Sequence, residues 1–306
     1  MNNFEGQSTI GHASGIGDTK KQADFLRRNE SFVLECQNLN ALENNITNRT
    51  CPTPSQDEID KMSQMSKDNA DRIEFEDKAN ARRIAFYLGR MAVDDFGEII
   101  TLAGNGYGFG ALKILRGMYE RVVTAKYLVL NPSETRIFIE QSAIDKWKLW
   151  RRTIAALPCM SEKLMPEQVR LLQDSNNSTR KKRKIPICQK CKQPMPDSPW
   201  TRKGIDAMAQ EVDPDLYQFY GQFYLEGTAQ SHANMLGMEN RMERTEAGWK
   251  YKDASENEQQ LSLMLGHYLL LNMLEFENTL FGFGLNSELE ARKSVCQSIW
   301  NPTKLT

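Results

Sequence analysis

The sequence predicts an all-α protein, an up-and-down helical bundle of about six or seven helices with a basic, irregular insertion. Apolar residues recur at helical spacing along most of the chain, and strand-like alternation is almost absent. No segment repeats with a period of about 20–50 residues, which argues against a solenoid. The longest apolar stretch, residues 263–274, is shorter than the roughly 20 residues that a membrane-spanning helix needs.

The composition is that of an ordinary soluble globular protein, with 40% hydrophobic and 26% charged residues among 306. Lys and Arg number 39 against 40 Asp and Glu, so the net charge of −1 gives no global field that would attract nucleic acid or a membrane. The N-terminus shows no secretory signal, and we therefore expect a cytoplasmic protein. In that compartment the six cysteines are thiols or metal ligands rather than a disulfide framework.

Four segments are predicted. Residues 1–18 are rich in glycine and small polar residues and indicate a disordered leader. Residues 19–78 form N-terminal helices, with one amphipathic helix over 20–48 and an acidic, exposed helix over 57–78. Residues 79–285 form the helical bundle domain, and residues 286–306 a C-terminal tail.

Within the bundle domain, the apolar pattern predicts two long antiparallel helices over 79–130 and a third that follows Pro132 and ends near Pro158. Helical patterning resumes over 200–212, 214–236 and 256–281. The insertion, residues 175–199, holds four prolines and a basic run, which do not sustain a helix.

A glycine cluster, residues 104–110, separates the two long helices. Glycines allow backbone N–H groups to approach an anion at a helix N-terminus. No strand precedes this cluster and its spacing is not that of a phosphate-binding loop, so we favour a tight connection between helices, with an anion site as the alternative.

Arg116 and Glu120 lie four residues apart on the polar side of the second long helix. One interpretation is an ion pair on a solvated face. The other is that Gly117 lets a further helix pack here, which would turn Arg116 and Glu120 inward as a polar site.

Five aromatic residues crowd into positions 217–224, and Ser231 and His232 follow. Such aromatics usually form core, but they also line pockets that stack flat ligands, and histidine titrates near neutral pH. Tyr220, Tyr224 and Ser231 are therefore candidate binding residues. His267, in the most apolar helix, is expected in the core.

Cys188 and Cys191 have the spacing of half a zinc ribbon. A structural zinc site needs four ligands, usually from two such pairs, and the sequence holds one pair. Zinc and ordinary or redox-active thiols both remain open, and no other cofactor is predicted.

A basic run lies within the insertion and consists of Arg180, Lys181, Lys182, Arg183 and Lys184. Residues 180–203 hold nine bases and one acid, a local charge of +8. This run is either a solubilising loop or a contact for RNA or another polyanion.

Short motifs over residues 80–285 resemble a widespread bacterial all-helical family of unknown function: Arg116 and Glu120 on one helix, then Trp200, then Tyr220 with Ser231 and His232. The family is itself similar to the HEPN-like helical domains of prokaryotic toxin and phage-defence systems. This resemblance implies that Arg116, Glu120 and His232 share an interior site. HEPN ribonucleases carry a histidine four to six residues after an arginine, a motif that this sequence lacks.

Two functions follow from these patterns. The first is a helical binding or regulatory module of a bacterial stress, toxin or phage-defence system, with RNA, a protein partner or a second copy as its partner and no membrane contact. The alternative is a metal-independent HEPN-like ribonuclease. In this enzyme, His232 would be the general acid or base and Arg116 would stabilise charge on a phosphate. Glu120 would orient either His232 or Arg116.

Overall fold

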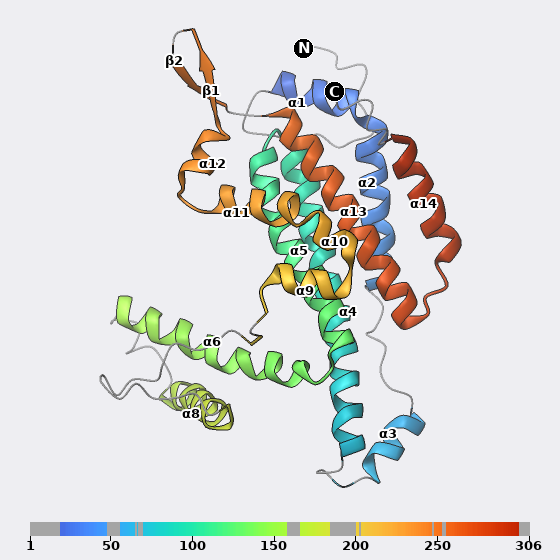
Figure 1. Cartoon of the computed structure of the whole chain (residues 1–306), viewed down its shortest axis with the longest axis vertical. Coiled ribbons are helices and arrows are strands. Elements are labelled where there is room, and N and C mark those ends of the chain that lie inside the picture. The colour runs from blue at the N-terminus through green and yellow to red at the C-terminus, as the bar shows by residue number, and fades with distance from the viewer. Residues whose placement is uncertain are drawn as a thin grey trace, which may run out of the picture. The chain divides into compact units, whose positions relative to one another are not determined.

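The computed structural model describes residues 19–47, 56–64, 66, 70–157, 166–183, 200–201, 203–246, 248–252 and 255–299. This part of the chain is helical apart from one two-stranded sheet (Figure 1), so the all-α prediction is confirmed. The described residues form thirteen α-helices and one π-helix rather than six or seven helices. The predicted leader, residues 1–18, lies outside the described residues.

The longer helices are α2 (Glu30–Thr47), α4 (Ala70–Gly104), α5 (Gly108–Leu130), α6 (Glu134–Ala156), α8 (Pro166–Lys182), α13 (Glu256–Phe281) and α14 (Asn286–Ile299). The shorter ones are α1 (Thr19–Arg28), α3 (Gln56–Ser63), α9 (Ile205–Val212), α10 (Pro214–Gln218), α11 (Glu226–Ser231) and α12 (Met235–Glu239). The π-helix η1 (Gly221–Leu225) precedes α11, and the strands are β1 (Met242–Thr245) and β2 (Gly248–Tyr251). None of the described helices combines the length and the apolar composition that a membrane span requires.

The two long helices and the third after them are confirmed as α4, α5 and α6. The separate helix predicted over 57–78 is wrong, because α3 ends at Ser63 and residues 70–78 are the first turns of α4. The single helix predicted over 20–48 is wrong: it is divided at Asn29, whose side-chain amide and backbone N–H both donate to the Phe25 carbonyl, at 2.9 and 3.0 Å, a local side-chain bond that favours a turn. The predicted irregular insertion is wrong over 175–182, which α8 includes, because the first proline of that stretch comes only at Pro186. Residues 286–299, expected within a tail, form α14.

The chain divides into two compact units, each made of segments that are separate in sequence. Unit 1 comprises residues 1–55, 82–129 and 205–306, and unit 2 comprises residues 56–81 and 130–204. Helix α4 begins in unit 2 and continues into unit 1.

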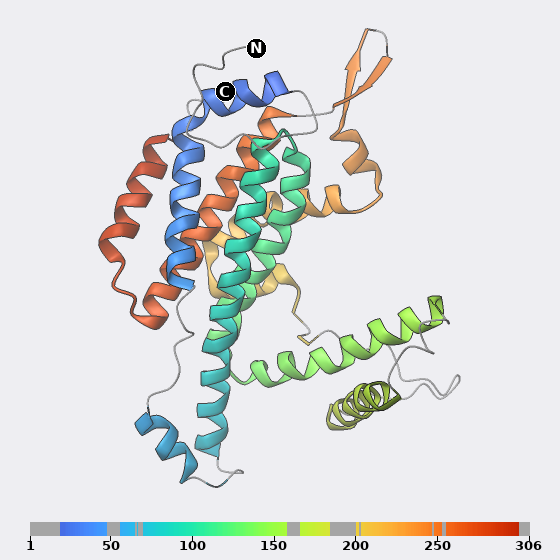
Figure 2. The same ribbon diagram turned by 180° about the vertical axis from the view of Figure 1, so that it is seen from behind.

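The core of unit 1 is built around α5 and α13, which contribute the longest runs of buried residues. Helix α2 lies along α13, and α14 contacts both (Figures 1 and 2). Phe96, Leu115 and Leu269 have no exposed surface. His267 is also fully buried, which confirms its predicted place in the core.

The α4–α5 connection is tight, as the glycine cluster predicts. Gly106 has φ of +88°, which glycine adopts without strain. A Cβ on Gly108 would lie 2.5 Å from the backbone nitrogen of Gln259 on α13, so the missing side chain lets two helices meet closely.

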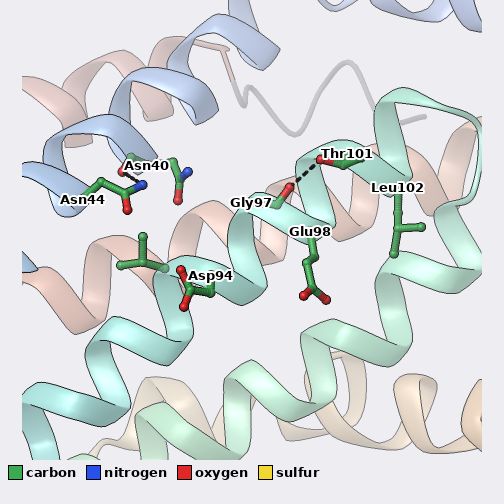
Figure 3. A pocket seen from close by; sticks show the side chains of 8 residues that line it. Asn40, Asn44, Asp94, Gly97, Glu98, Thr101 and Leu102 are labelled. Carbon is green, nitrogen blue, oxygen red and sulfur yellow. Dashed lines mark hydrogen bonds between the residues drawn. The ribbon is translucent and has the colours of Figure 1, made fainter. Parts of the chain in front are cut away.

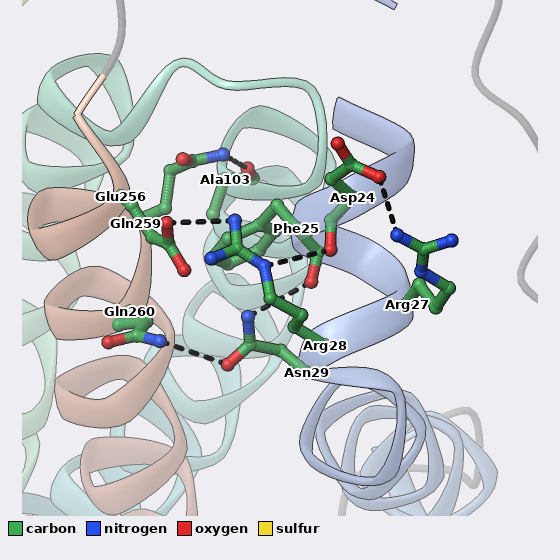
Figure 4. Close-up of polar contacts among 9 residues, drawn as sticks. All are labelled: Asp24, Phe25, Arg27, Arg28, Asn29, Ala103, Glu256, Gln259 and Gln260. Carbon is green, nitrogen blue, oxygen red and sulfur yellow. Dashed lines mark hydrogen bonds and ion pairs between the residues drawn. The ribbon is translucent and has the colours of Figure 1, made fainter. Parts of the chain in front are cut away.

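Polar contacts fasten α1 and α4 to the beginning of α13 (Figure 4). The Gln259 amide donates to the Ala103 carbonyl at 2.7 Å. Arg28 forms an ion pair with Glu256 at 2.9 Å, and the Gln260 amide donates to Asn29 at 3.0 Å.

A buried pair of carboxyl groups, Glu43 of α2 and Glu277 of α13, lies within unit 1. The two carboxyl groups interact electrostatically, and the backbone of α4 at Gly89 leaves the room that the Glu277 carboxyl occupies. Burial raises the pKa of Glu277, and the neighbouring Glu43 raises it further. The pair therefore holds a proton at neutral pH, and a carboxylic acid donates to a carboxylate.

Unit 2 is held by contacts among α4, α6 and α8. Arg136 is ion-paired with Asp77 at 3.0 Å, and Phe138 meets Trp200 edge to face at 5.1 Å between ring centres. Lys182 pairs with Glu140 at 3.1 Å.

The hairpin β1–β2 stands apart from the helices of unit 1 in both views (Figures 1 and 2). Its strands are antiparallel, with Arg244 opposite Trp249 and Glu243 opposite Lys250. The Tyr251 hydroxyl accepts from Arg241 at 2.9 Å, which ties the base of the hairpin to the preceding turn.

Candidate functional site

Arg116 and Glu120 lie on one face of α5 and form an ion pair at 3.2 Å. The Arg116 side chain is 26% exposed and that of Glu120 42%, so the pair is at the boundary of the core rather than on an open surface. The pair is therefore neither fully solvated nor fully turned inward, the two arrangements that the sequence left open.

Tyr224 of η1 covers the Arg116 guanidinium. The Arg116 Nη2 donates to the Tyr224 hydroxyl at 3.3 Å, and Cζ lies 4.8 Å from the centre of the ring. Tyr220 stacks on Tyr224 at 5.2 Å with 16° between the ring planes. Arg116, Tyr224 and Tyr220 thus form a ladder of flat groups, which we call the arginine–tyrosine ladder.

Tyr119 supports the ladder from the core. It is fully buried, its ring is tilted at 6.3 Å from both Tyr220 and Tyr224, and its hydroxyl donates to the Leu216 carbonyl at 3.0 Å. Burial raises the pKa of Tyr119, so this hydroxyl stays protonated and remains a donor.

The segment that carries the two ladder tyrosines is a π-helix, a rare conformation that is frequent at functional sites. It brings Gly227, the second residue after η1, against α5, where a Cβ would lie 2.5 Å from the Leu112 carbonyl oxygen and 2.7 Å from the Arg116 Cβ. The predicted role of Gly117 is therefore wrong: the Arg121 guanidinium lies over it, and the close approach is made by Gly227.

One nitrogen of the ladder lacks a partner. The Arg116 Nε is buried, and it has no hydrogen-bond partner among the residues that the structure describes. Buried donors are nearly always paired, so an unpaired one marks a place where a ligand or water acceptor belongs.

Acidic groups limit the positive charge at the ladder. Glu120 neutralises Arg116, and Asp206 at the beginning of α9 is close enough to act on Tyr220. Burial raises the pKa of Tyr220, with Asp206 and Tyr224 adding to the effect and Arg116 opposing it.

His232 does not join this cluster. Successive contacts, Tyr224 with Arg116 and then Gly227 with Leu112, show that the segment runs toward the start of α5. His232 is exposed, and among the described residues no hydrogen bond, ion pair or ring contact joins it to Arg116 or Glu120. Ser231 donates back to the Gly227 carbonyl at 2.7 Å.

The basic run belongs to unit 2 and to a helix end. Arg180, Lys181 and Lys182 form the last turn of α8, where positive charge is favourable beside the helix carbonyls. Arg180 donates to Asn176 at 3.0 Å, and Arg183 donates to Gln141 of α6. These bonds hold the first part of the run within unit 2, whereas Lys184 lies outside the described residues.

Cys188 and Cys191 also lie outside the described residues, so the zinc hypothesis stays a prediction. Within the described part of the chain, no three His, Cys, Asp or Glu side chains gather as a metal site would require.

A groove of about 560 Å³ lies between α2 and α4 of unit 1 (Figure 3). Asn40, Asn44, Asp94, Glu98 and Thr101 supply its polar groups. Several of these are already engaged, because Arg90 pairs with Asp94 at 3.1 Å and Thr101 donates to the Gly97 carbonyl at 2.9 Å. The arginine–tyrosine ladder, with its unpaired buried nitrogen, is the stronger candidate site.

The sequence singled out Arg116 with Glu120 and, separately, Tyr220 with Tyr224, but neither the contact between the two pairs nor the residues that support them. Tyr119 falls on the apolar side of α5, which hides its role among core residues. Gly227 and Asp206 are single residues without a motif. The three-residue spacing from Tyr224 to Gly227 on one helical face was the available signal.

The fold and this cluster define an all-helical protein with a cation–aromatic site on its second long helix. The chain belongs to a family of unknown function, DUF5677, whose model matches residues 82–248. This segment contains all members of the ladder. Comparison with curated proteins finds no match, and comparison with solved structures finds none either.

Proposed function

We propose that the chain is a non-catalytic binding module of the bacterial cytoplasm, and that the arginine–tyrosine ladder takes a nucleotide unit of single-stranded nucleic acid. The observation that carries this proposal is the partly exposed Arg116 guanidinium, which lies against a stack of aromatic rings. A guanidinium with a free donor recognises an oxyanion such as phosphate.

The tyrosines supply the second half of the recognition. Tyr220 and Tyr224 are partly exposed and already hold flat groups parallel to one another. A base added to such a stack contributes about 1–3 kcal/mol, whichever base it is. The proposed ligand therefore combines one phosphate with one ring.

The charges of the site favour one phosphate over a run of phosphates. Glu120 and Asp206 leave no surplus of positive charge around Arg116. For single strands the logarithm of the binding constant falls with the logarithm of salt concentration by about 0.7 per phosphate contacted. We expect a slope near this value, whereas binding through all five bases of residues 180–184 would give a slope several times steeper.

The experiment is fluorescence anisotropy with a labelled single-stranded oligoadenylate, with AMP, adenosine and inorganic phosphate as separate competitors. We expect AMP to compete better than adenosine or phosphate alone. Arg116→Gln should weaken binding about 10- to 100-fold, because a charged hydrogen bond is lost. Tyr220→Ala should weaken it by a similar factor.

Lys113→Gln is the matched control, since it removes one positive charge from an exposed position of the same helix. It should change affinity less than twofold. Binding that is unaffected by Arg116→Gln but lost on neutralising residues 180–184 would move the site to the basic run and overturn the proposal.

The ribonuclease alternative is tested in the same samples. Cleavage of the oligonucleotide in EDTA that disappears in His232→Ala would replace the binding module by an enzyme. The absence of a described contact between Arg116 and His232 favours the binding module. The proposal that the module acts in stress, toxin or phage defence is supported by the family resemblance alone.

A further inference from the structure

One face of the hairpin β1–β2 carries two aromatic rings and an arginine. Side chains alternate between the two faces of a strand, and residues directly opposite each other in an antiparallel pair share a face. The register pairs Arg244 with Trp249, and Met242 with Tyr251. These four side chains therefore form one face of the hairpin, which we call the aromatic face. Trp249 is 67% exposed and Tyr251 52%, so both rings are open to a ligand.

The aromatic face is positively charged, whereas the other face of the hairpin is neutral. None of the four side chains on the aromatic face is acidic. On the other face Glu243 lies opposite Lys250, so these two charges compensate each other. Among the residues that the structure describes, Arg244 forms no ion pair. Its charge is therefore available to an anionic ligand that also contacts the rings.

Arg241 fastens the hairpin to the elements that carry the ladder. Its Nη1 donates to the Tyr251 hydroxyl at 2.9 Å, and its Nε donates to Gln230 of α11 at 2.9 Å. Its guanidinium also lies over the Phe109 ring of α5, with Cζ 4.8 Å from the ring centre. Helix α5 holds Arg116, and α11 follows directly on η1, which holds Tyr224 and ends beside it. The aromatic face and the ladder are thus built on the same elements.

We propose that the aromatic face binds a second nucleotide of the single strand that the ladder holds, with a base stacked on Trp249 and a phosphate at Arg244. This inference rests on the proposed function and makes the partner an oligonucleotide that reaches both sites. Exposed rings on a strand form a platform on which the bases of a single strand stack. An arginine beside them supplies the charge that a backbone phosphate requires. An acidic peptide would match this charge but would bring no flat group to the rings.

The test is fluorescence anisotropy with two labelled probes, an adenylate dinucleotide that occupies the ladder alone and an oligoadenylate dodecamer that reaches both sites. Trp249→Ala should weaken dodecamer binding about tenfold or more, because one stacked base is lost, and should leave dinucleotide binding within about twofold. Trp249→Phe keeps a ring and should hold dodecamer binding within about threefold of wild type. The side chain is largely exposed, so all three proteins should give the same circular dichroism spectrum.

Two charge variants on opposite faces of the hairpin provide a matched control. Arg244→Gln removes a positive charge from the aromatic face, and Lys250→Gln removes one from the other face. Arg244→Gln should lower the salt slope of dodecamer binding by about 0.7, the value for one phosphate of a single strand. Lys250→Gln should leave the slope unchanged. Equal effects of the two variants would show that the face carries no specific phosphate contact and would overturn the inference.

Dodecamer binding that is the same in Trp249→Ala as in wild type would also overturn the inference. So would anionic phospholipid vesicles that bind wild type and are lost in Trp249→Ala while the dodecamer is retained, because the face would then belong to a membrane surface. The proposed function is tested separately by Arg116→Gln, which should weaken both probes. If Arg116→Gln changes neither probe but Trp249→Ala still weakens the dodecamer, the ladder proposal fails and the aromatic face alone binds the strand.

Discussion

At the scale of single residues, the position of the site depends on an absent side chain. Gly227 lies against the Leu112 carbonyl and Arg116, and this contact places Tyr224 over the guanidinium. A backbone carbonyl inside α5 does not move aside without breaking its helix. The ladder is therefore sensitive to one methyl group at a residue that touches no ligand.

Gly227→Ala should lower the free energy of unfolding by about 1–3 kcal/mol, because the added Cβ overpacks a rigid contact. Thermal unfolding followed by circular dichroism measures this loss. Gly221→Ala is the control, since nothing lies within 4 Å of a Cβ at that position. Equal effects of the two substitutions would show that the close contact is not what Gly227 provides.

The carboxyl pair predicts an unusual dependence of stability on pH. Burial raises the pKa of Glu43 to about 7 and that of Glu277 to about 10, both above the ordinary value of 4.5. A group whose pKa is raised by folding stabilises the protein most below its unfolded value. The contribution of the pair should therefore be complete below pH 4.5 and decrease as pH rises through 7 and toward 10.

Glu277→Gln isolates this effect, because the amide keeps a hydrogen-bond donor for Glu43 and does not ionise. Urea unfolding at pH 6, 8 and 9.5 should show a smaller loss of stability in the variant than in wild type. Glu239→Gln, at an exposed position, serves as the control. A wild-type profile that is flat over this range would contradict a shared proton.

At the scale of elements, two glycines of the α4–α5 connection differ in what surrounds them: Gly108 packs against α13, whereas Gly110 has room for a side chain. Gly108→Ala should destabilise unit 1 by about 1–3 kcal/mol, because its Cβ would meet the backbone of α13. Gly110→Ala should have little effect, since a Cβ there makes ordinary contacts of 3.7–3.8 Å. Comparison of the two melting temperatures checks the prediction, and a larger loss at Gly110 would contradict it.

Long helices were predictable because their apolar spacing persists over many turns, as in α4, α5 and α13. The break at Asn29 was not, because it depends on one amide that bonds the preceding turn. Likewise, η1 differs from an α-helix only in its hydrogen-bond partners, which leaves no trace in the spacing of aromatics. The full extent of α8 was not predictable either. The four prolines of residues 175–199 indicate an irregular segment, but they begin at Pro186 and do not affect the helix before it.

For the candidate site, too, local features were predictable from the sequence and long-range contacts were not. Arg116 with Glu120 and Tyr220 with Tyr224 are pairs one turn apart, which local spacing reveals. Bringing the two pairs together requires a contact over 108 residues of sequence, and periodicity holds no information on such contacts. For the same reason, the separation of His232 from Glu120 emerges only from the fold.

At the scale of the whole molecule, the two units are assembled from discontinuous segments, so no boundary in composition marks them. Among the residues whose burial is described, unit 1 holds most of the buried apolar ones, whereas α8 in unit 2 buries Asn176 and Thr179 alone. The free energy of local unfolding should therefore be higher in unit 1 than in α8 of unit 2.

Hydrogen exchange read by mass spectrometry should therefore show the slowest amides in α5 and α13. Exchange in α3 and α8 should be faster by orders of magnitude, because few buried contacts oppose their local opening. Lysine-rich peptides from α8 that are as protected as α13 would contradict this ordering.

The pairing of α2 with α13 joins an early helix to a late one. During synthesis at about 5–20 residues per second, the stretch from Thr47 to Phe281 takes on the order of 10 to 50 s to emerge. Throughout that interval Phe32, which is buried in the finished protein and lies 6.4 Å from the His267 ring of α13, lacks this neighbour. The nascent chain thus presents the α13-facing side of α2 to its surroundings until residue 281 has emerged, which makes α2 a binding segment for a ribosome-bound chaperone during that interval.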